Sequence, residues 1–395
     1  MGMVVMNIDL RHGDCRDVMA TMEPESVDAI VSDPPYGLGF MGKEWDHGVP
    51  GVEFWVEALR VAKPGAHLLA FGGTRTFHRL AVAIEDAGWE IRDCIMWVYG
   101  SGFPKSHNVS KAIDKLAGAQ PEIIGQSTKA RSTSGNSALP SIGGTTIYKT
   151  WNITSPSTEE AKQWDGYGTA LKPAWEPIIV ARKPLIGTIA ENVMQYGTGA
   201  INIDACRVQM KPDEFNELTK VVVENIIKGT SRKKTHVNFI SSTGPANPPN
   251  PLGRWPANLL HDGSSEATLG MRDAARYFFC SKASREDRDD GCQDMPNVLV
   301  GALQGSRDGS LNPSPLGAND HPTVKPTDLM TWLCRLVCAE GKVVLDPFCG
   351  SGSTGRGAMH AGAARFIGID LSEHYLEIAR RRIEAARHPM DSLLS

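Results

Sequence analysis

Long apolar runs are missing from this sequence. No stretch approaches the roughly 18 consecutive apolar residues that a membrane-spanning helix needs. The amino-terminal end also has no basic region followed by an apolar run, so a secretory leader is not expected. The eight cysteines include no Cys-x-x-Cys pair, which argues against a zinc ribbon and a disulfide framework. We therefore expect a cytoplasmic protein with neither a membrane segment nor a bound metal.

A strong excess of charge is missing too, since the formal net charge is −4. That value excludes a protein coated with positive charge, so any nucleic-acid surface must be local. The densest basic stretch, residues 228–236 (KGTSRKKTH), is consistent with a phosphate-contacting loop and almost equally with a solvated surface run. Cys334 and Cys338 are spaced for one helix face, where small buried thiols are more common than metal ligands. With 395 residues, 41% of them apolar, the chain can bury a large core.

The two ends of the chain share an alternating pattern of short apolar runs and amphipathic segments, which is typical of a parallel sheet covered by helices. Strands are expected at Val4–Ile8, Val27–Val31, His67–Phe71, Ile91–Val98, Lys342–Leu345 and Arg365–Ile369. Helices are expected around Leu329–Val337, at Ser353–His360 and at Glu373–Ala386. The carboxyl-terminal part therefore contains a complete βαβ unit.

The middle of the chain has a different texture, rich in Ser, Thr, Gly and Pro from about Gly100 to Pro322. Regular structure is expected to be sparse there. The exception is Trp175–Ala181, an apolar run that could return to the sheet as a further strand. We expect three parts, residues 1–100, 101–321 and 322–395.

A glycine-rich loop, Asp346-Pro-Phe-Cys-Gly350-Ser-Gly352-Ser-Thr-Gly355, joins the strand at 342–345 to the following helix. Glycines in such a loop let the backbone approach a ligand that lies at the helix N-terminus. The spacing also fits G-x-G-x-x-G, with Asp370 about 20 residues after the first glycine, as ribose recognition requires. Taken alone, the loop suits a nicotinamide dehydrogenase equally well.

A second motif, Asp33-Pro34-Pro35-Tyr36, directly follows the strand at 27–31 and so lies at the carboxyl edge of the sheet, where α/β proteins bind ligands. An exocyclic base nitrogen is conjugated with its ring and needs help to pyramidalise. The Asp33 carboxylate and the Pro34 carbonyl can accept its two N–H hydrogens, and Tyr36 offers a face for stacking the base. A dehydrogenase has no use for this turn and would need a proton-transferring His, Lys or Tyr.

With both motifs in this order, the chain resembles the β class of DNA amino-methyltransferases, in which the catalytic motif comes first and the cofactor motif last. The stretches DPPYGLGFMGKEWD and LKPAWEPIIVARKP resemble the phage and prophage branch of that family. The resemblance implies a Rossmann-like α/β fold with a seven-stranded, mostly parallel sheet that has one reversed strand. It also implies an inserted target-recognition region and the cofactor S-adenosylmethionine. The catalytic residues it implies are Asp33, Pro34, Pro35 and Tyr36, and the cofactor-binding residues are Asp14, Thr323, Lys325, Asp346, Pro347, Phe348, Gly350, Gly352 and Asp370.

The implied activity is methylation of the N6 amine of adenine in double-stranded DNA, on a base extruded into the pocket. Methylation of the N4 amine of cytosine is the alternative, because the same turn serves both amines. RNA is a further alternative substrate, and a fold that binds DNA without turnover is a further alternative function, although the intact Asp33 argues against the latter. The resemblance also implies a connection with restriction-modification systems. No segment of this chain resembles a nuclease site, so a solitary enzyme is expected. Dimers are common among such enzymes, and a homodimer is compatible with this chain.

Overall fold

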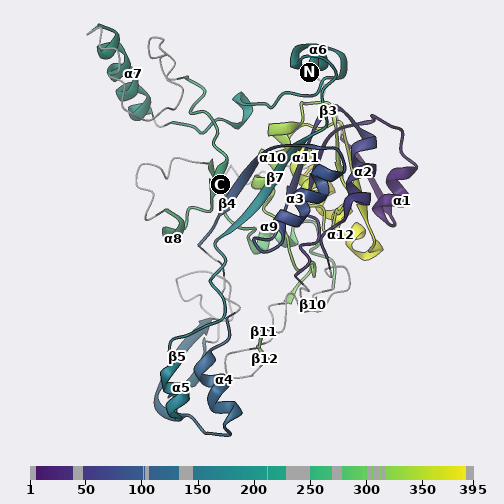
Figure 1. The fold of residues 1–395 in the computed structure, drawn as a ribbon. Coiled ribbons are helices and arrows are strands. Elements are labelled where there is room, and N and C mark those ends of the chain that lie inside the picture. Colours follow the sequence, from purple (N-terminus) through teal and green to yellow (C-terminus); the bar gives the residue numbers. More distant parts are fainter. Residues whose placement is uncertain are drawn as a thin grey trace. The chain divides into compact units, whose positions relative to one another are not determined.

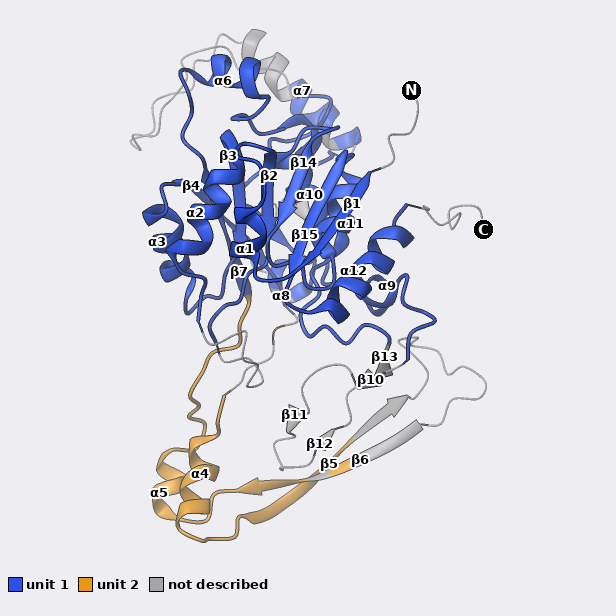
Figure 2. Cartoon of the chain, turned by 90° about the vertical axis from the view of Figure 1, so that its right-hand side faces the viewer, with its two compact units in different colours: residues 1–100, 175–302, 314–395 blue, residues 101–174, 303–313 orange. Residues whose placement is uncertain are grey.

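The computed structural model describes residues 6–38, 48–100, 102, 106–132, 146–210, 212–227, 250–268, 278–296, 298–299, 304–305, 311–312 and 316–387. The chain forms two compact units (Figure 2). The first contains residues 1–100, 175–302 and 314–395, and the second contains residues 101–174 and 303–313. Residues 175–302 therefore group with the two ends of the chain, and they include the run at Trp175–Ala181 that was expected to return to the sheet.

The first unit is built on a nine-stranded sheet (Figure 1). Its order is β1 (Asn7–His12), β15 (Arg365–Asp370), β14 (Val343–Asp346), β2 (Val27–Ser32), β3 (Ala62–Phe71), β7 (Trp175–Arg182), β4 (Glu90–Val98), β8 (Leu259–His261) and β9 (Phe278–Phe279). All neighbours pair in parallel except β7, which is antiparallel to both β3 and β4. The expected mostly parallel α/β fold with one reversed strand is confirmed. The sheet has two strands more than expected, because the short β8 and β9 extend it beyond β4.

Helices pack against both faces of this sheet. Along β2, Ala29 and Val31 belong to one buried cluster while Ile30 between them belongs to the other, as the alternation of side chains in a strand requires. Helices α1 (Cys15–Ala20), α2 (Val52–Val61) and α3 (Phe77–Asp86) share the cluster of Ile30. Helices α10 (Thr327–Val337), α11 (Ser353–His360) and α12 (Glu373–Ala385) share the cluster of Val31 on the opposite face. The helices expected at the carboxyl-terminal end are thus confirmed.

The two ends of the chain meet in the middle of the sheet. Strand β14 pairs with β2 through Val344–Ala29 and Leu345–Ile30, and β1 pairs with β15 along its whole length. The carboxyl ends of β2, β14 and β15 therefore lie side by side at one edge. Both sequence motifs follow these strand ends.

Helices α10 and α11 pack unusually closely where α11 carries glycine. A Cβ atom on Gly357 would lie 2.5 Å from the carbonyl carbon and 2.8 Å from the carbonyl oxygen of Met330 in α10. Real Cβ atoms do not approach backbone so closely, so only glycine permits this contact. The segment that presents Lys325 and the loop that precedes α11 are held together by this packing.

The expectation of sparse regular structure in the middle of the chain is wrong. The second unit contains α4 (Val109–Leu116), α5 (Glu159–Gln163), the pair β11 (Gln304–Gly305) and β12 (Leu311–Asn312), and an antiparallel hairpin of β5 (Glu122–Ser132) and β6 (Thr146–Ser155). Thr and Ile recur in both long strands, and such β-branched residues favour a pleated sheet even among polar neighbours. Asp114 ties α4 to α5 by accepting hydrogen bonds from the backbone N–H groups of Ser157 and Thr158.

The remaining elements lie in the first unit: α6 (Ile189–Tyr196), a 3-10 turn (Asp204–Cys206), α7 (Pro212–Ile227), α8 (Ser265–Thr268), α9 (Arg285–Asp289), and the pair β10 (Val298–Leu299) and β13 (Leu316–Gly317). In the described part of the chain, no helix has the length and apolar character needed to cross a membrane. The basic stretch at residues 228–236 lies outside the described residues.

The first strand begins later than expected. The pattern indicated Val4–Ile8, but β1 runs from Asn7 to His12, and residues 4 and 5 lie outside the described residues. The charged Asp9 and Arg11 within β1 concealed it, because an edge strand tolerates charged side chains that pair with one another. Asp9 accepts hydrogen bonds from both Arg11 and Arg365 of the neighbouring β15.

Candidate active site

The turn that follows β2 holds its aspartate in a dense polar cluster. Oδ1 of Asp33 accepts a hydrogen bond of 2.8 Å from the Tyr36 hydroxyl, and Oδ2 lies 2.5 Å from the Lys325 ammonium nitrogen. Burial raises the pKa of Asp33, and the Lys325 charge and the Tyr36 hydroxyl only partly offset this. Both oxygens of Asp33 are thus already engaged in contacts within the protein.

Tyr36 is fixed by the loop after β3. The Thr76 hydroxyl donates to the Tyr36 carbonyl at 2.6 Å, and a Cβ on Gly73 would lie 3.2 Å from the Tyr36 ring. Burial, followed by the nearby Asp33 and Glu176 carboxylates, raises the pKa of Tyr36 well above its usual value. Tyr36 therefore remains a neutral phenol that donates a hydrogen bond. Sequence reasoning missed Gly73 and Thr76, which no motif links to the turn.

A second carboxylate, Glu176 in β7, completes the cluster. Because β7 runs antiparallel to its neighbours, its first residues lie at the edge where the parallel strands end. Glu176 accepts hydrogen bonds of 3.1 Å from both the Tyr99 and Tyr36 hydroxyls, and it lies 3.5 Å from the Lys325 nitrogen. The returning strand at 175–181 was expected, but nothing in the sequence pointed to Glu176 as part of the site.

Two lysines balance the two carboxylates. Burial by itself would lower the pKa of the buried Lys325, but Asp33 and Glu176 outweigh it and the pKa is raised. Burial lowers the pKa of the second lysine, Lys282, whose ammonium lies 3.5 Å from the centre of the Tyr99 ring. Lys325 was expected to bind the cofactor, and that role stays a prediction; in the structure its nitrogen contacts the Asp33 carboxylate.

The first residue of the glycine-rich loop joins that loop to the catalytic turn. Asp346 is buried at the end of β14, and its carboxylate accepts hydrogen bonds from the hydroxyls of Ser32 (2.5 Å) and Thr354 (2.6 Å) and from the Phe348 N–H (3.0 Å). Burial raises its pKa to about 6 against the effect of these hydrogen bonds. Ser32 immediately precedes Asp33, so a single carboxylate fixes both motifs relative to each other.

The loop glycines adopt left-handed backbone conformations, with φ of 50° at Gly350 and 77° at Gly352. The Gly350 N–H donates to the Asp370 carboxylate at 2.8 Å. A Cβ on Gly350 would lie 2.7 Å from the His321 ring, and one on Gly352 would lie 2.8 Å from the Ala379 side chain. The expected requirement for glycine is therefore supported, but its visible cause is the close approach of protein groups.

Two of the expected cofactor residues end neighbouring strands. Asp370 ends β15, and Asp14 follows β1, in which His12 pairs with Asp370. Asp14 caps α1 and binds Arg16. Phe348 packs beside Phe54 and Trp55 at ring distances of 5.9 and 6.1 Å. Thr323 is exposed, and its carbonyl bonds the His321 ring at 3.0 Å. The assignment of these residues and of Pro347 to the cofactor stays a prediction.

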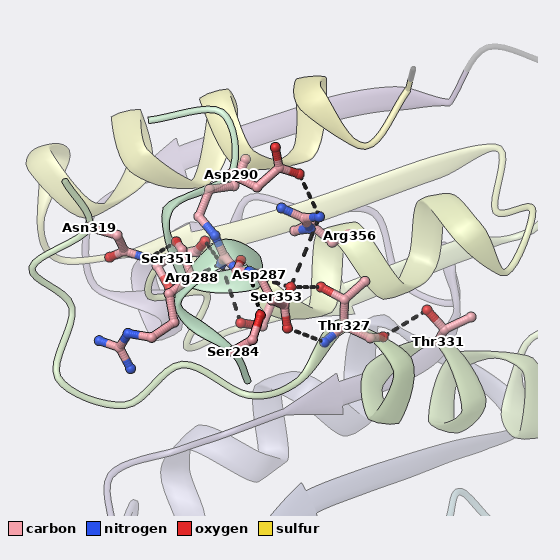
Figure 3. A network of polar contacts seen from close by, with 11 residues as sticks. Ser284, Asp287, Arg288, Asp290, Asn319, Thr327, Thr331, Ser351, Ser353 and Arg356 are labelled. Atoms are coloured by element: carbon pink, nitrogen blue, oxygen red, sulfur yellow. Dashed lines mark hydrogen bonds and ion pairs between the residues drawn. The ribbon is translucent and has the colours of Figure 1, made fainter. Parts of the chain in front are cut away.

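A buried arginine holds the glycine-rich loop within a polar network, of which Figure 3 labels Asp287, Thr327 and Arg356. Arg382 of α12, which has no exposed surface, donates to the carbonyls of Ser351 (2.6 Å) and Asp287 (2.9 Å). The Asp287 carboxylate in turn accepts the backbone N–H (3.0 Å) and hydroxyl (2.5 Å) of Thr327, two residues beyond Lys325. Arg356 pairs with Asp290 in the same network at 2.8 Å. This network fixes the loop and the Lys325 segment together.

A cavity of about 370 Å³ is lined in part by Asp287 and Arg356 of this network and does not lie at the catalytic turn. Its walls carry the positive charges of Lys282 and Arg356 against four acidic side chains, which are Glu286, Asp287, Asp290 and Asp328. The acidic excess makes it a poor site for phosphate. Burial raises the pKa of Cys338 to about 12 and raises the pKa of Cys334 in α10 well above its usual value, so both side chains are neutral thiols.

The catalytic turn and the glycine-rich loop also fall within one family match. A model of DNA methylases of the N6 and N4 type matches residues 27–381, which include Asp33 at one end and Asp370 at the other. The chain belongs to the N6/N4 DNA methylase family. S-adenosylmethionine is the methyl donor of this family, and the resemblance to DNA amino-methyltransferases is thereby confirmed, while the phage and prophage branch stays a prediction.

Curated relatives of this DNA methylase match it over shorter segments. The type II methyltransferase M2.DpnII of Streptococcus pneumoniae is 50% identical over 68 residues, 17% of this chain and 25% of the relative. M2.LlaDCHI of Lactococcus lactis subsp. cremoris is 33% identical over 123 residues, 30% and 42% of the two chains. The DNA adenine methyltransferase YhdJ of Escherichia coli (strain K12) is 39% identical over 69 residues, 18% and 23%. The chain thus spans between about a quarter and two fifths of the length of these relatives.

Solved structures are similar over nearly the whole chain at low identity. The complex of M1.HpyAVI with S-adenosylmethionine is 15% identical with a TM-score of 0.42, covering 95% of this chain and 98% of its own. The cytosine-N4-specific PvuII DNA methyltransferase is 12% identical with a TM-score of 0.44, covering 96% and 87%.

Proposed function

We propose that this DNA methylase transfers a methyl group to the exocyclic N6 amine of adenine in double-stranded DNA. The observation that carries the proposal is the hydrogen bond between Ser32 and Asp346. It ties the residue before Asp33 to the first residue of the glycine-rich loop, so that an anionic acceptor and the expected cofactor loop occupy the same edge of the sheet.

The residues at this edge suit the cofactor. Asp370 uses its two oxygens to hold the N–H groups of Ser372 and Gly350, which leaves lone pairs for further hydroxyl donors. Phe348 and its aromatic neighbours provide an apolar wall beside it. Asp14 and Asp370 would hold the ribose hydroxyls or the purine edge, and Phe348 would contact the purine ring. When bound, S-adenosylmethionine supplies a methyl group activated by a positively charged sulfur.

The chemistry left to the protein is to make the base amine nucleophilic. Asp33 would accept one N–H of the amine and the Pro34 carbonyl the other, which localises the nitrogen lone pair toward the methyl group. The nitrogen would gain the methyl group that the cofactor supplies and would lose one proton, which the Asp33 carboxylate is placed to accept. The uncharged Tyr36 phenol lies beside Asp33 and would stack on the base. No covalent bond to the protein is needed.

Adenine is proposed over cytosine because YhdJ, which is a DNA adenine methyltransferase, matches this chain at 39% identity. Reaching an amine inside a duplex requires the base to be extruded, at a cost of a few kcal/mol. Contacts with the DNA backbone must offset that cost.

The test is single-molecule sequencing of methyl-deficient DNA after incubation with the purified protein and S-adenosylmethionine. We expect N6-methyladenine at one sequence motif and no mark with the Asp33→Ala variant. N4-methylcytosine would keep the mechanism and overturn the base assignment. No mark on DNA, with cofactor still bound, would refute the proposed activity and direct attention to RNA or to a protein that only binds.

A further inference from the structure

The contacts that Asp33 makes in this structure compete with its proposed role as acceptor of the substrate amine. Its Oδ1 accepts the Tyr36 hydroxyl and its Oδ2 contacts the Lys325 ammonium. A carboxylate whose charge is already used by a phenol and an ammonium is a weaker acceptor for a third donor. An arriving amine therefore has to compete with groups that are present before it binds.

Glu176 is placed to resolve this competition. A phenol carries one hydroxyl proton, yet the Tyr36 oxygen lies 2.8 Å from Asp33 and 3.1 Å from Glu176. The proton can serve only one carboxylate at a time, and a rotation about the C–O bond moves it between them. Lys325 lies within reach of the same two carboxylates, at 2.5 Å from Asp33 and 3.5 Å from Glu176.

Glu176 is itself held in place. Tyr99 at the end of β4 donates to its other oxygen at 3.1 Å, and Glu176 lies directly across from Trp97 in the β4–β7 pairing. The backbone pairing and the Tyr99 hydrogen bond fix the carboxylate without using the oxygen that faces Tyr36. That oxygen remains available as a second acceptor.

We propose that Glu176 is a positioning residue that takes the Tyr36 hydrogen bond from Asp33 when the substrate amine arrives. Asp33 Oδ1 is then released to accept the amine N–H, while Lys325 stays between the two carboxylates. This inference rests on the proposed function, because it assigns Asp33 the amine as its partner. It adds a residue that neither motif contains.

The charges around Asp33 allow a second test of the proposal, which is the pKa of Asp33. The groups that face Asp33 are Tyr36, Lys325 before α10, Glu176 in β7 and Asp346 at the end of β14. Tyr99 and Lys282 lie one contact further out, on Glu176. The negative charge of Glu176 raises the pKa of Asp33, so its removal should lower that pKa.

The decisive variant is Glu176→Gln, which keeps the shape of the side chain and removes its charge. We expect the single-turnover rate of methyl transfer to fall about 10- to 100-fold, with the KM for DNA and the Kd for cofactor within about threefold of the wild type. The acidic limb of the pH–rate profile should shift to lower pH. In a Tyr36→Phe background, which has no proton to transfer, Glu176→Gln should slow the reaction little further. Additive rate losses, or an unmoved acidic limb, would overturn the proposal.

Two further variants distinguish the effect of the Glu176 charge from that of its side-chain length, and both from a general loss of structure. Glu176→Asp keeps the charge but withdraws it by one methylene, so it should slow transfer while leaving the acidic limb near that of the wild type; a normal rate in this variant would contradict the role of Glu176. Glu90→Gln is the matched control, since Glu90 lies in the adjacent β4 and pairs with Arg182 at the other end of β7. It should change neither the rate nor the profile.

A measurement that needs no turnover separates this proposal from the proposed function. The Asp33 carboxyl can be titrated by ¹³C NMR in protein labelled at aspartate, with its signal assigned through Asp33→Asn. We expect a lower pKa in Glu176→Gln than in the wild type. If the wild type leaves DNA unmodified but this shift is seen, only the proposed substrate fails; if the wild type is active and the shift is absent, only the role of Glu176 fails.

Discussion

The close contact between α10 and α11 makes Gly357→Ala a sharp test of how the site is held together. Alanine is the best helix former and normally gains up to about 1 kcal/mol over glycine inside a helix. Here its Cβ would lie 2.5 Å from the Met330 carbonyl carbon and 2.7 Å from the Met330 Cβ. Overpacking costs about 1–3 kcal/mol, and backbone atoms cannot move aside by changing rotamer, so the upper end applies. We expect a net loss of about 2 kcal/mol in the free energy of unfolding.

Urea denaturation followed by circular dichroism measures this difference as a lower midpoint at an unchanged slope. The comparison variant is Gly355→Ala, whose Cβ would meet the ends of the Ile383 and Phe366 side chains rather than backbone. Those side chains can shift, so its loss should be smaller. Cofactor affinity should fall with Gly357→Ala as well, because the displaced helices carry the Lys325 segment and the glycine-rich loop. A variant more stable than the wild type would show that helix propensity outweighs the contact and would refute this reasoning.

Three further predictions concern the two motifs. Asp33→Ala should abolish methyl transfer and leave the cofactor Kd, measured by calorimetry, within a few-fold of the wild type; full activity would remove the proposed mechanism. Gly350→Val should block cofactor binding, since its side chain would collide with the His321 ring and its backbone has a φ of 50°; unchanged affinity would place the cofactor elsewhere. Asp346 has a folded-state pKa of about 6, above the usual value of 3.8. The folded state therefore binds the proton of Asp346 more tightly than the unfolded state does. As the pH rises from about 4 to 6, the contribution of this residue to the free energy of unfolding falls. Wild-type stability relative to Asp346→Asn should therefore fall over that range by up to about 3 kcal/mol in parallel urea titrations, and a constant difference would contradict the raised pKa.

The elements at the two ends of the chain could be predicted because each signal is local. The run Val27–Val31 is apolar on both faces, as a central parallel strand requires, and Ser353–His360 follows a glycine loop in the usual way. Charged residues inside β1 broke the same pattern, so that strand was displaced by several residues. The hairpin of β5 and β6 was missed because its few Thr and Ile residues lie among polar neighbours that are typical of loops.

The motif residues of the candidate site could be named from the sequence, but their partners could not. Asp33 and Tyr36 belong to one short segment with a chemical rationale. Glu176 reaches them only because β7 is reversed between β3 and β4. Local composition does not predict the direction of a strand. Thr76 and Lys325 likewise meet Tyr36 and Asp33 through the fold, across distances in sequence that no periodicity reveals.

The position of β14 in the interior of the sheet also affects how the protein is made. The edge of β2 that β14 occupies is synthesised about 310 residues before its partner. At about 5–20 residues per second, translation leaves that edge of the buried, apolar strand without a partner for roughly 15 to 60 seconds. Unpaired apolar edges are templates for aggregation. The emerging chain should therefore depend on chaperones or on low expression temperature until β14 is released from the ribosome, and truncation before residue 343 should yield insoluble protein.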